Sequence, residues 1–386
     1  MISYGKQTID QDDIKAVIEV LNGDWLTQGP AVDSFEEELC KYFGADHACV
    51  VSNGTAALHL AAMALGWGPG DIIITSPITF LATVNSIYYV GATPDFVDID
   101  PVSYTLDLDK LESKIKKYIS DGKNVKAIIG VDYAGHPCDW KKLKDIADNY
   151  SIQLVNDNCH ALGASYKGSI HYAAKYADLV TQSYHPVKNF TTGEGGAVLT
   201  NDSNIDSKIR ALRSHGMTKN INELEKCDGL WYYEMNEPGF NYRITDLQCA
   251  LGSSQLKKLD NFVMKRREIA IFYDHKFSSN DFFTTPLVKE NIKHAYHLYP
   301  LLINFEKINI SKKVFFKKML QSGINLQVHY IPIHLQPFYK NNYGFKTGDF
   351  PNSEDFYKKE ISLPIYPLLS TEDLSDITSS ISRIIN

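Results

Sequence analysis

A single lysine among small, polar and glycine residues is the side chain of this sequence best suited to covalent chemistry. Lys188 lies in the run 182–196, between two short apolar segments, 177–180 and 197–200, that are typical of buried strands. The glycines of this run permit backbone shapes and close approaches that a Cβ atom would block. The amine of such a lysine can form a Schiff base with a carbonyl cofactor when its neighbours lower its pKa. The alternative is a solvated surface lysine beside a glycine turn.

A carboxylate and an anion site could complete a pocket around that lysine. Asp157 follows the apolar segment 153–155, so we expect it at the end of a buried strand, where a carboxylate needs a cation. Capping the N-terminus of a following helix is the alternative role. The run 52–57, Ser-Asn-Gly-Thr-Ala-Ala, separates a predicted strand from a predicted helix. A helix N-terminus offers free N–H groups and a positive dipole end to a phosphate, although by itself this run indicates only a well-capped helix.

The elements that must position these residues alternate between short apolar strands and helices. The predicted strands are 48–51, 72–75, 94–97, 127–131, 153–155, 179–181 and 197–199, and the helices between them are 55–65, 80–90, 108–118 and 140–148. Such alternation indicates βαβ units and a mostly parallel sheet, which binds ligands at the carboxyl ends of its strands. Other predicted elements are helices 10–21, 31–43, 205–214, 246–259, 262–277, 312–321 and 371–385, and a strand at 296–303.

The lysine and aspartate segments resemble the cofactor motifs of one family. Ser-Tyr-His-x-x-Lys followed by Thr-Thr-Gly-Glu-Gly-Gly, and Asp-x-x-His-Ala-Leu-Gly-Ala from Asp157 onward, are similar to the DegT/DnrJ/EryC1/StrS sugar aminotransferases, which use pyridoxal 5′-phosphate (PLP). The resemblance covers essentially the whole chain. It implies an α/β fold, the fold-type I PLP-dependent transferase. We expect a large domain over residues 1–250, with a mostly parallel seven-stranded sheet between helices, and a smaller C-terminal α/β domain over 251–386 that includes the long connecting helix.

The resemblance also implies roles for individual residues. Lys188 would form the Schiff base with PLP and transfer protons, and Asp157 would pair with the pyridine nitrogen. The other implied contacts are Gly54, Thr55 and Ser183 at the phosphate, Phe80 on the ring face, His160 near the phenolic oxygen, and Asn241 at the phosphate bound to the other subunit. The contact of Asn241 implies a homodimer with shared active sites. Packing roles in the core remain open for Phe80 and His160.

Further segments resemble one subgroup of the family, the transaminases of pseudaminic acid biosynthesis. These segments are 25–30, 185–188, 231–235, 327–339, 348–351 and 361–364. The subgroup implies L-glutamate as amino donor and a UDP-linked 2-acetamido-2,6-dideoxy-4-keto-hexose as acceptor. The implied candidates for the nucleotide-sugar pocket are Thr27, Gln28, His329 and Tyr330, which could equally be polar loop residues and core aromatics. One departure is the phosphate turn, which reads Ser-Asn-Gly-Thr-Ala where the subgroup more often has Ser-Ala-Thr-Ser.

Three other functions stay open at this stage. The first is an aminotransferase for another nucleotide 4-keto sugar, such as a UDP-bacillosamine precursor or a dTDP-sugar. The second is a PLP-dependent dehydratase on the same fold, against which Lys188 argues because the known family dehydratases have histidine there. The third is a non-catalytic regulatory protein that kept the fold. A Rossmann dehydrogenase is excluded, since no Gly-x-Gly-x-x-Gly follows the first predicted strand.

The composition of the chain indicates its cellular compartment and excludes some classes of binding partner. The chain has 386 residues, 44% of them hydrophobic and 22% charged, and its formal net charge of −7 gives no support to nucleic-acid binding. No apolar run approaches the length of a membrane span, and the first residues lack a signal-peptide pattern, so we expect a cytoplasmic protein without membrane contact. None of the six cysteines has zinc-site spacing, which predicts buried free thiols and no metal site.

Overall fold

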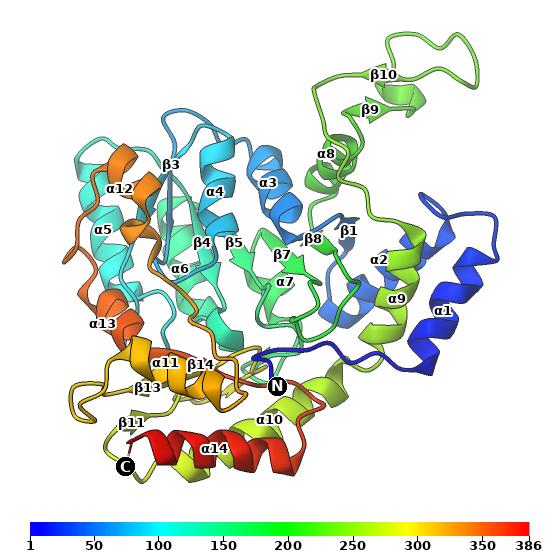
Figure 1. Ribbon diagram of the computed structural model, residues 1–386. Coiled ribbons are helices and arrows are strands. Elements are labelled where there is room, and N and C mark those ends of the chain that lie inside the picture. Colours follow the sequence, from blue (N-terminus) through cyan, green and yellow to red (C-terminus); the bar gives the residue numbers. More distant parts are fainter. Residues whose placement is uncertain (386) are drawn as a thin grey trace.

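A seven-stranded sheet forms the centre of the computed structural model, which describes residues 1–385 (Figure 1). Its strands are β1 (His47–Val51), β2 (Ile72–Thr75), β3 (Thr93–Phe96), β4 (Val125–Val131), β5 (Gln153–Asp157), β7 (Leu179–Ser183) and β8 (Gly196–Thr200). Their order is β1-β8-β7-β5-β4-β2-β3, and β8 runs in the direction opposite to the other six strands. The predicted mostly parallel sheet is confirmed, and each strand predicted for this sheet begins and ends within two residues of its observed bounds.

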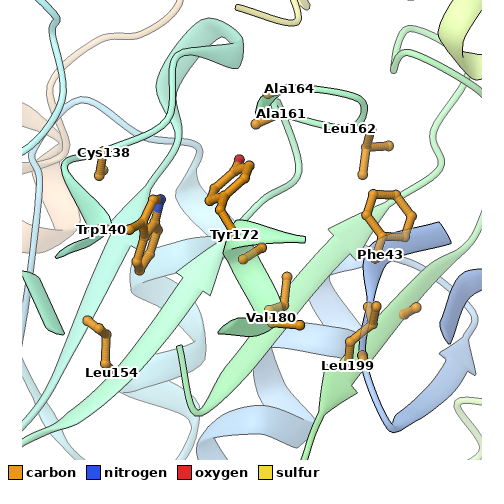
Figure 2. Packing of buried hydrophobic residues seen from close by; sticks show 14 of the residues in the cluster. Phe43, Cys138, Trp140, Leu154, Ala161, Leu162, Ala164, Tyr172, Val180 and Leu199 are labelled. Atoms are coloured by element: carbon orange, nitrogen blue, oxygen red, sulfur yellow. The ribbon is translucent and has the colours of Figure 1, made fainter. Parts of the chain in front are cut away.

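Helices cover both faces of this sheet. One face packs against α2 (Pro30–Phe43), α5 (Leu108–Ser120), α6 (Trp140–Tyr150) and α7 (Tyr172–Tyr176), and the other against α3 (Gly54–Ala64), α4 (Leu81–Tyr89) and α8 (Ser203–Arg213). Figure 2 shows the first of these cores, where Trp140 and Tyr172 pack with Leu154 and Val180. Successive strand residues alternate between the two cores, as in Val50 and Val51 of β1. Burial on both faces explains why strands such as β2 and β4 contain continuous apolar runs.

A separate core lies over a smaller antiparallel sheet, ordered β11-β13-β14, at the bottom of Figure 1. This sheet consists of β11 (Phe283–Thr284), β13 (Tyr299–Ile303) and β14 (Glu360–Leu363), and its helices are α10 (Leu259–Phe277), α11 (Lys312–Gln321) and α14 (Thr371–Ile385). The N-terminal segment joins this core, because Ile2 pairs with Ile324 and the carbonyl of Tyr4 accepts a hydrogen bond from Ile365 N–H at 3.1 Å. The division of the chain at residue 250 stays a prediction.

The segment after β13 returns to the large sheet before it enters β14. Ile333 N–H donates to the carbonyl of Pro77 at 2.9 Å, and Ile333, Tyr339 and Phe350 pack with Val84 of α4. This segment contains α12 (Pro337–Tyr343) and α13 (Pro351–Lys359), which no sequence pattern predicted. The other elements are α1 (Gln11–Leu21), α9 (Asp246–Leu256), β6 (Ser165–Tyr166) and β12 (Ile292–Lys293).

An arm projects from the body of the molecule between α8 and α9 (Figure 1). It carries β9 (Met217–Thr218) paired with β10 (Glu234–Met235). Large apolar side chains at its tip are solvent-exposed in the single chain, with Leu230 at 100% and Trp231 at 74%. All six cysteines are free thiols, as predicted, but the expectation that all are buried is wrong, because Cys40 and Cys159 are half-buried and Cys227 is exposed on this arm.

Candidate active site

A cavity of about 630 Å³ opens at the carboxyl ends of the parallel strands. Its walls come from the segments that follow β1, β2, β5 and β7, and from residues of the C-terminal half. It brings together nine of the predicted site residues: Gly54, Thr55, Phe80, Asp157, His160, Ser183, Lys188, His329 and Tyr330. Within residues 1–385, no cluster of His, Cys, Asp or Glu is arranged to hold a metal ion, and no helix is long and apolar enough to cross a membrane.

Lys188 lines this cavity from a loop between β7 and β8 that is held by backbone hydrogen bonds. Tyr184 N–H donates to the carbonyl of Gly195 at 2.9 Å, and Lys188 N–H donates to the carbonyl of His185 at 2.8 Å. Gly193 has a φ of 81°, in the left-handed region that favours glycine. Within the described chain the Lys188 amine forms no hydrogen bond or ion pair. Burial lowers its pKa, although the charges of Cys159 and Asp157 act in the opposite direction.

Asp157 ends β5 as a buried carboxylate whose partners are all neutral. Its Oδ2 accepts a hydrogen bond from Thr83 Oγ1 at 2.7 Å, and its Oδ1 accepts one from Cys159 N–H at 3.2 Å. In the part of the chain that the structure describes, no lysine, arginine or histidine forms an ion pair with it, and only 5% of its surface is exposed. No helix begins after β5, so the N-cap alternative is wrong. A buried carboxylate of this kind fits a protonated ring nitrogen of a ligand.

The N-terminus of α3 faces the cavity beside Ser183. Asn53 caps the helix, because its Oδ1 accepts a hydrogen bond from Ala56 N–H at 2.8 Å. The N–H groups of Gly54 and Thr55 donate to no oxygen of residues 1–385 and stay available to a ligand. A Cβ atom on Gly54 would lie 2.7 Å from Ser183 Cβ, so only glycine lets the helix end approach this hydroxyl. Two free N–H groups, a hydroxyl and the helix dipole fit a phosphate group.

Aromatic and imidazole side chains form the opposite wall. Tyr330 Oη lies 3.0 Å from His160 Nε2, and the ring of Phe80 lies 5.9 Å from that of Tyr330. Burial lowers the pKa of His160 well below its usual value, and that of His329 to about 3. Both imidazoles are therefore neutral near pH 7. Phe80 is 54% exposed, so the alternative of an ordinary core phenylalanine is wrong.

Three predicted residues lie outside this cavity in the single chain. Asn241 is solvent-exposed and pairs with Ser214 at the base of the arm. Thr27 and Gln28 are exposed on the loop before α2, where Thr27 pairs with Thr245. Within one chain, the structure does not bring these three residues to Lys188.

The cavity also contains residues that the sequence analysis did not select, among them Tyr4, Thr83, Tyr242 and His297. Thr83 could have been selected from the sequence, because it lies three residues after Phe80 on the same face of a predicted helix. Tyr4 had none. It reaches the cavity only because the N-terminal segment pairs with residues more than 300 positions away.

Taken together, a cavity lysine, a buried carboxylate and a helix N-terminus on this α/β fold define a PLP-dependent transferase. Residues 7–382 match the DegT/DnrJ/EryC1/StrS aminotransferase family. The chain belongs to this family, whose members are PLP-dependent sugar aminotransferases.

Relatives with 36–41% sequence identity span the full length of the chain. The UDP-4-amino-4,6-dideoxy-N-acetyl-beta-L-altrosamine transaminase of Campylobacter jejuni is 41% identical over 100% of this chain and 98% of its own. The spore coat polysaccharide biosynthesis protein SpsC of Bacillus subtilis is 37% identical over 100% and 97%. The structure of Helicobacter pylori PseC, an aminotransferase of pseudaminic acid biosynthesis, superposes with a TM-score of 0.89 at 36% identity, covering 100% of this chain and 99% of that one.

Proposed function

We propose that this enzyme transfers the amino group of L-glutamate to C4 of a UDP-linked 2-acetamido-2,6-dideoxy-4-keto-hexose. The product is UDP-4-amino-4,6-dideoxy-N-acetyl-β-L-altrosamine, an intermediate of pseudaminic acid biosynthesis, and the reaction takes place in the cytoplasm. The observation that carries the transaminase activity is the position of Lys188 in one cavity with Asp157, a buried carboxylate without a cationic partner among the described residues. The Campylobacter relative at 41% identity supports the choice of sugar.

The residues of the cavity fit PLP. Gly54, Thr55 and Ser183 would hold its phosphate, and Asp157 would hold its ring nitrogen in the protonated form. Phe80 would cover one face of the ring and His160 would lie near its phenolic oxygen. When bound, PLP supplies an aldehyde that joins to amines through Lys188 and a ring that withdraws electrons from the reacting carbon.

Lys188 has the properties of the acid–base group. Because burial lowers the pKa of its amine, the neutral form is more accessible near pH 7 than it is for a solvated lysine. The neutral Nζ can take the proton from Cα of glutamate, and the resulting ammonium would deliver it to the C4′ carbon of bound PLP. In the second half of the reaction the same Nζ delivers a proton to C4 of the sugar. Both protonation states of one side chain are therefore used.

We also propose that two copies of the chain share their active sites. Asn241, Thr27 and Gln28 are exposed and lie outside the cavity of their own chain, while the arm beside Asn241 presents apolar side chains such as Trp231 to solvent. An apolar surface of this kind is typical of an interface. Asn241 of the partner subunit would then reach the phosphate of PLP, and Thr27 and Gln28 would contribute to the sugar pocket with His329 and Tyr330.

The test is a product assay. The purified enzyme is incubated with PLP, L-glutamate and the UDP-linked 4-keto sugar, and the product is identified by mass and by NMR coupling constants at C4. The expected product carries an amine at C4 with the L-altro configuration. The similarity to the spore coat protein SpsC, at 37% identity, makes another nucleotide 4-keto sugar the second candidate. A higher kcat/KM for a UDP-bacillosamine precursor or a dTDP-linked 4-keto sugar would select that candidate instead.

A further inference from the structure

Behind His329, two side chains of β14 form a hydrogen-bonded chain that leads away from the cavity. His329 Nδ1 lies 2.8 Å from Ser362 Oγ, and Ser362 Oγ lies 2.6 Å from Glu360 Oε1. The second carboxylate oxygen of Glu360 accepts a hydrogen bond from His329 N–H at 3.1 Å. Glu360 and Ser362 are fully buried, and His329 is 8% exposed. Neither Glu360 nor Ser362 lines the cavity, so neither can touch a substrate.

Counting protons along this chain fixes the tautomer of His329. Burial raises the pKa of Glu360 to about 7, against the opposing charge of Lys312, so at pH 8 the ionised carboxylate predominates and can only accept hydrogen bonds. The single hydroxyl hydrogen of Ser362 is therefore donated to Glu360. The Ser362 oxygen can then only accept from His329, which requires a hydrogen on Nδ1. Nε2 of the neutral ring is left as a hydrogen-bond acceptor.

Counting hydrogens in the same way fixes the orientation of the hydroxyl group of Tyr330, the residue that follows His329. Ala134 N–H donates to His160 Nδ1 at 3.3 Å, so the ring hydrogen of His160 lies on Nε2 and is donated to Tyr330 Oη. The hydroxyl hydrogen of Tyr330 is then free for a ligand. His329 and Tyr330 thus give the cavity wall one acceptor and one donor side by side.

We propose that Glu360 and Ser362 are positioning residues that hold His329 in the Nδ1–H tautomer, so that Nε2 accepts a hydrogen bond from a hydroxyl or acetamido N–H of the nucleotide sugar. The proposal rests on the proposed function for the identity of the ligand. A neutral acceptor does not match the carboxylates of glutamate or the phosphate of PLP, which are acceptors themselves, whereas a sugar carries O–H and N–H donors. The hydroxyl of Tyr330 would donate to a neighbouring oxygen of the same sugar.

The decisive variant is Glu360→Gln, which keeps the shape of the side chain and reverses the direction of the hydrogen bonds. The glutamine oxygen still accepts from His329 N–H, so its NH₂ group faces Ser362 and donates to it. The hydroxyl hydrogen of Ser362 then turns to His329 Nδ1, which moves the ring hydrogen to Nε2. The ring would present a donor where the wild-type enzyme presents an acceptor.

The experiment combines ¹⁵N NMR of histidine-labelled enzyme at pH 8 with steady-state kinetics. The His329 signals, assigned by their loss in His329→Gln, should show hydrogen on Nδ1 in the wild type and on Nε2 in Glu360→Gln. The KM for the sugar should rise about tenfold in Glu360→Gln and in Ser362→Ala, while the KM for glutamate changes less than about twofold. Glu372→Gln, on the exposed first turn of α14, is the matched control.

Two results would overturn the proposal. One is hydrogen on Nε2 of His329 in the wild type. The other is an unchanged KM for the sugar in a Glu360→Gln enzyme whose tautomer has reversed. If Glu360→Gln does not fold, Ser362→Ala and the wild-type spectrum still decide the question. A failure of the proposed function is recognised separately, because the tautomer is read without any substrate and a wild-type enzyme without transaminase activity would leave that spectrum unchanged.

Discussion

Thr83 Oγ1 donates a hydrogen bond to Asp157 Oδ2 at 2.7 Å, joining the first turn of α4 to the end of β5. Thr79 lies behind it, with its hydroxyl 2.7 Å from that of Thr83. Together these hydroxyls orient the carboxylate without neutralising it. Asp157 therefore has hydroxyl and amide partners but no cationic one among the described residues, while its position is fixed from the neighbouring helix.

This relationship predicts the effect of removing the hydroxyl of Thr83. Thr83→Val keeps the volume of the side chain but loses the hydrogen bond, so we expect kcat to fall about tenfold and PLP to bind more weakly. Thr83→Ser retains the hydroxyl and should stay within about threefold of the wild type. Steady-state kinetics and PLP titration check both variants. Equal kcat values for Thr83→Val and the wild type would show that Thr83 does not orient Asp157.

Replacing Asp157 should have a larger effect than replacing its hydrogen-bond donor. Asp157→Asn removes the negative charge in a buried site, so the ring nitrogen of PLP would lose the carboxylate that keeps it protonated. We expect kcat to fall by roughly a hundredfold or more. Single-turnover kinetics with glutamate measure this effect on the chemical step. A wild-type rate in this variant would remove Asp157 from its proposed role.

Buried histidines should make the stability of the protein depend on pH. Burial lowers the pKa of His329 to about 3 and of His136 to about 4, and it also lowers the pKa of His160, His294 and His297. Below pH 6.5 the unfolded chain therefore binds protons at these five sites that the folded chain does not bind. The free energy of unfolding should consequently fall as the pH decreases from 7 towards 4.

Two buried carboxyl groups have the opposite effect on the pH dependence of the free energy of unfolding. Burial raises the pKa of Asp132 to about 6 and that of Glu360 to about 7, so near pH 5 the folded state holds protons there that the unfolded state releases. Five histidines outweigh two carboxyl groups in this window. Urea unfolding of the protein at pH 7.5 and 5.5 checks the sign, with a lower midpoint expected at pH 5.5. A midpoint that is equal or higher at pH 5.5 would contradict the account.

Shared active sites predict that two defective variants restore activity when their subunits mix. Lys188→Ala lacks the acid–base group, and Asn241→Ala lacks the proposed contact to the other subunit's phosphate. In a mixed dimer one of the two sites receives an intact Lys188 and an intact Asn241. After random exchange of subunits we expect about a quarter of the wild-type activity. If each active site were built from one chain, the mixture would show only the mean of the two parent activities.

The sequence predicted the large sheet well because every strand in it is buried on both faces. A run such as 127–131 is continuously apolar and needs no knowledge of its partners. The motif residues Lys188, Asp157 and Gly54 could be placed for a related reason, since each lies at the carboxyl end of one of these strands or a few residues beyond it. Parallel strands bring their carboxyl ends to one edge of the sheet.

What the sequence did not reveal depends on contacts between distant segments. Tyr4 reaches the cavity through the pairing of Ile2 with Ile324, and β14 becomes recognisable as a strand only through its pairing with β13. Glu360 and Ser362 look like ordinary strand residues until the fold brings them behind His329. No local periodicity carries that information, because the hydrogen bonds join residues 31 and 33 positions apart.

The most direct test of the central claim is the absorption spectrum of the PLP-loaded enzyme before and after addition of L-glutamate, compared with that of Lys188→Ala. The account predicts that glutamate converts the visible band of the wild-type enzyme to the shorter-wavelength band of pyridoxamine phosphate, with release of 2-oxoglutarate. Lys188→Ala should keep the wild-type circular dichroism spectrum but release no 2-oxoglutarate. Release of 2-oxoglutarate by Lys188→Ala at the wild-type rate would contradict the assignment of Lys188.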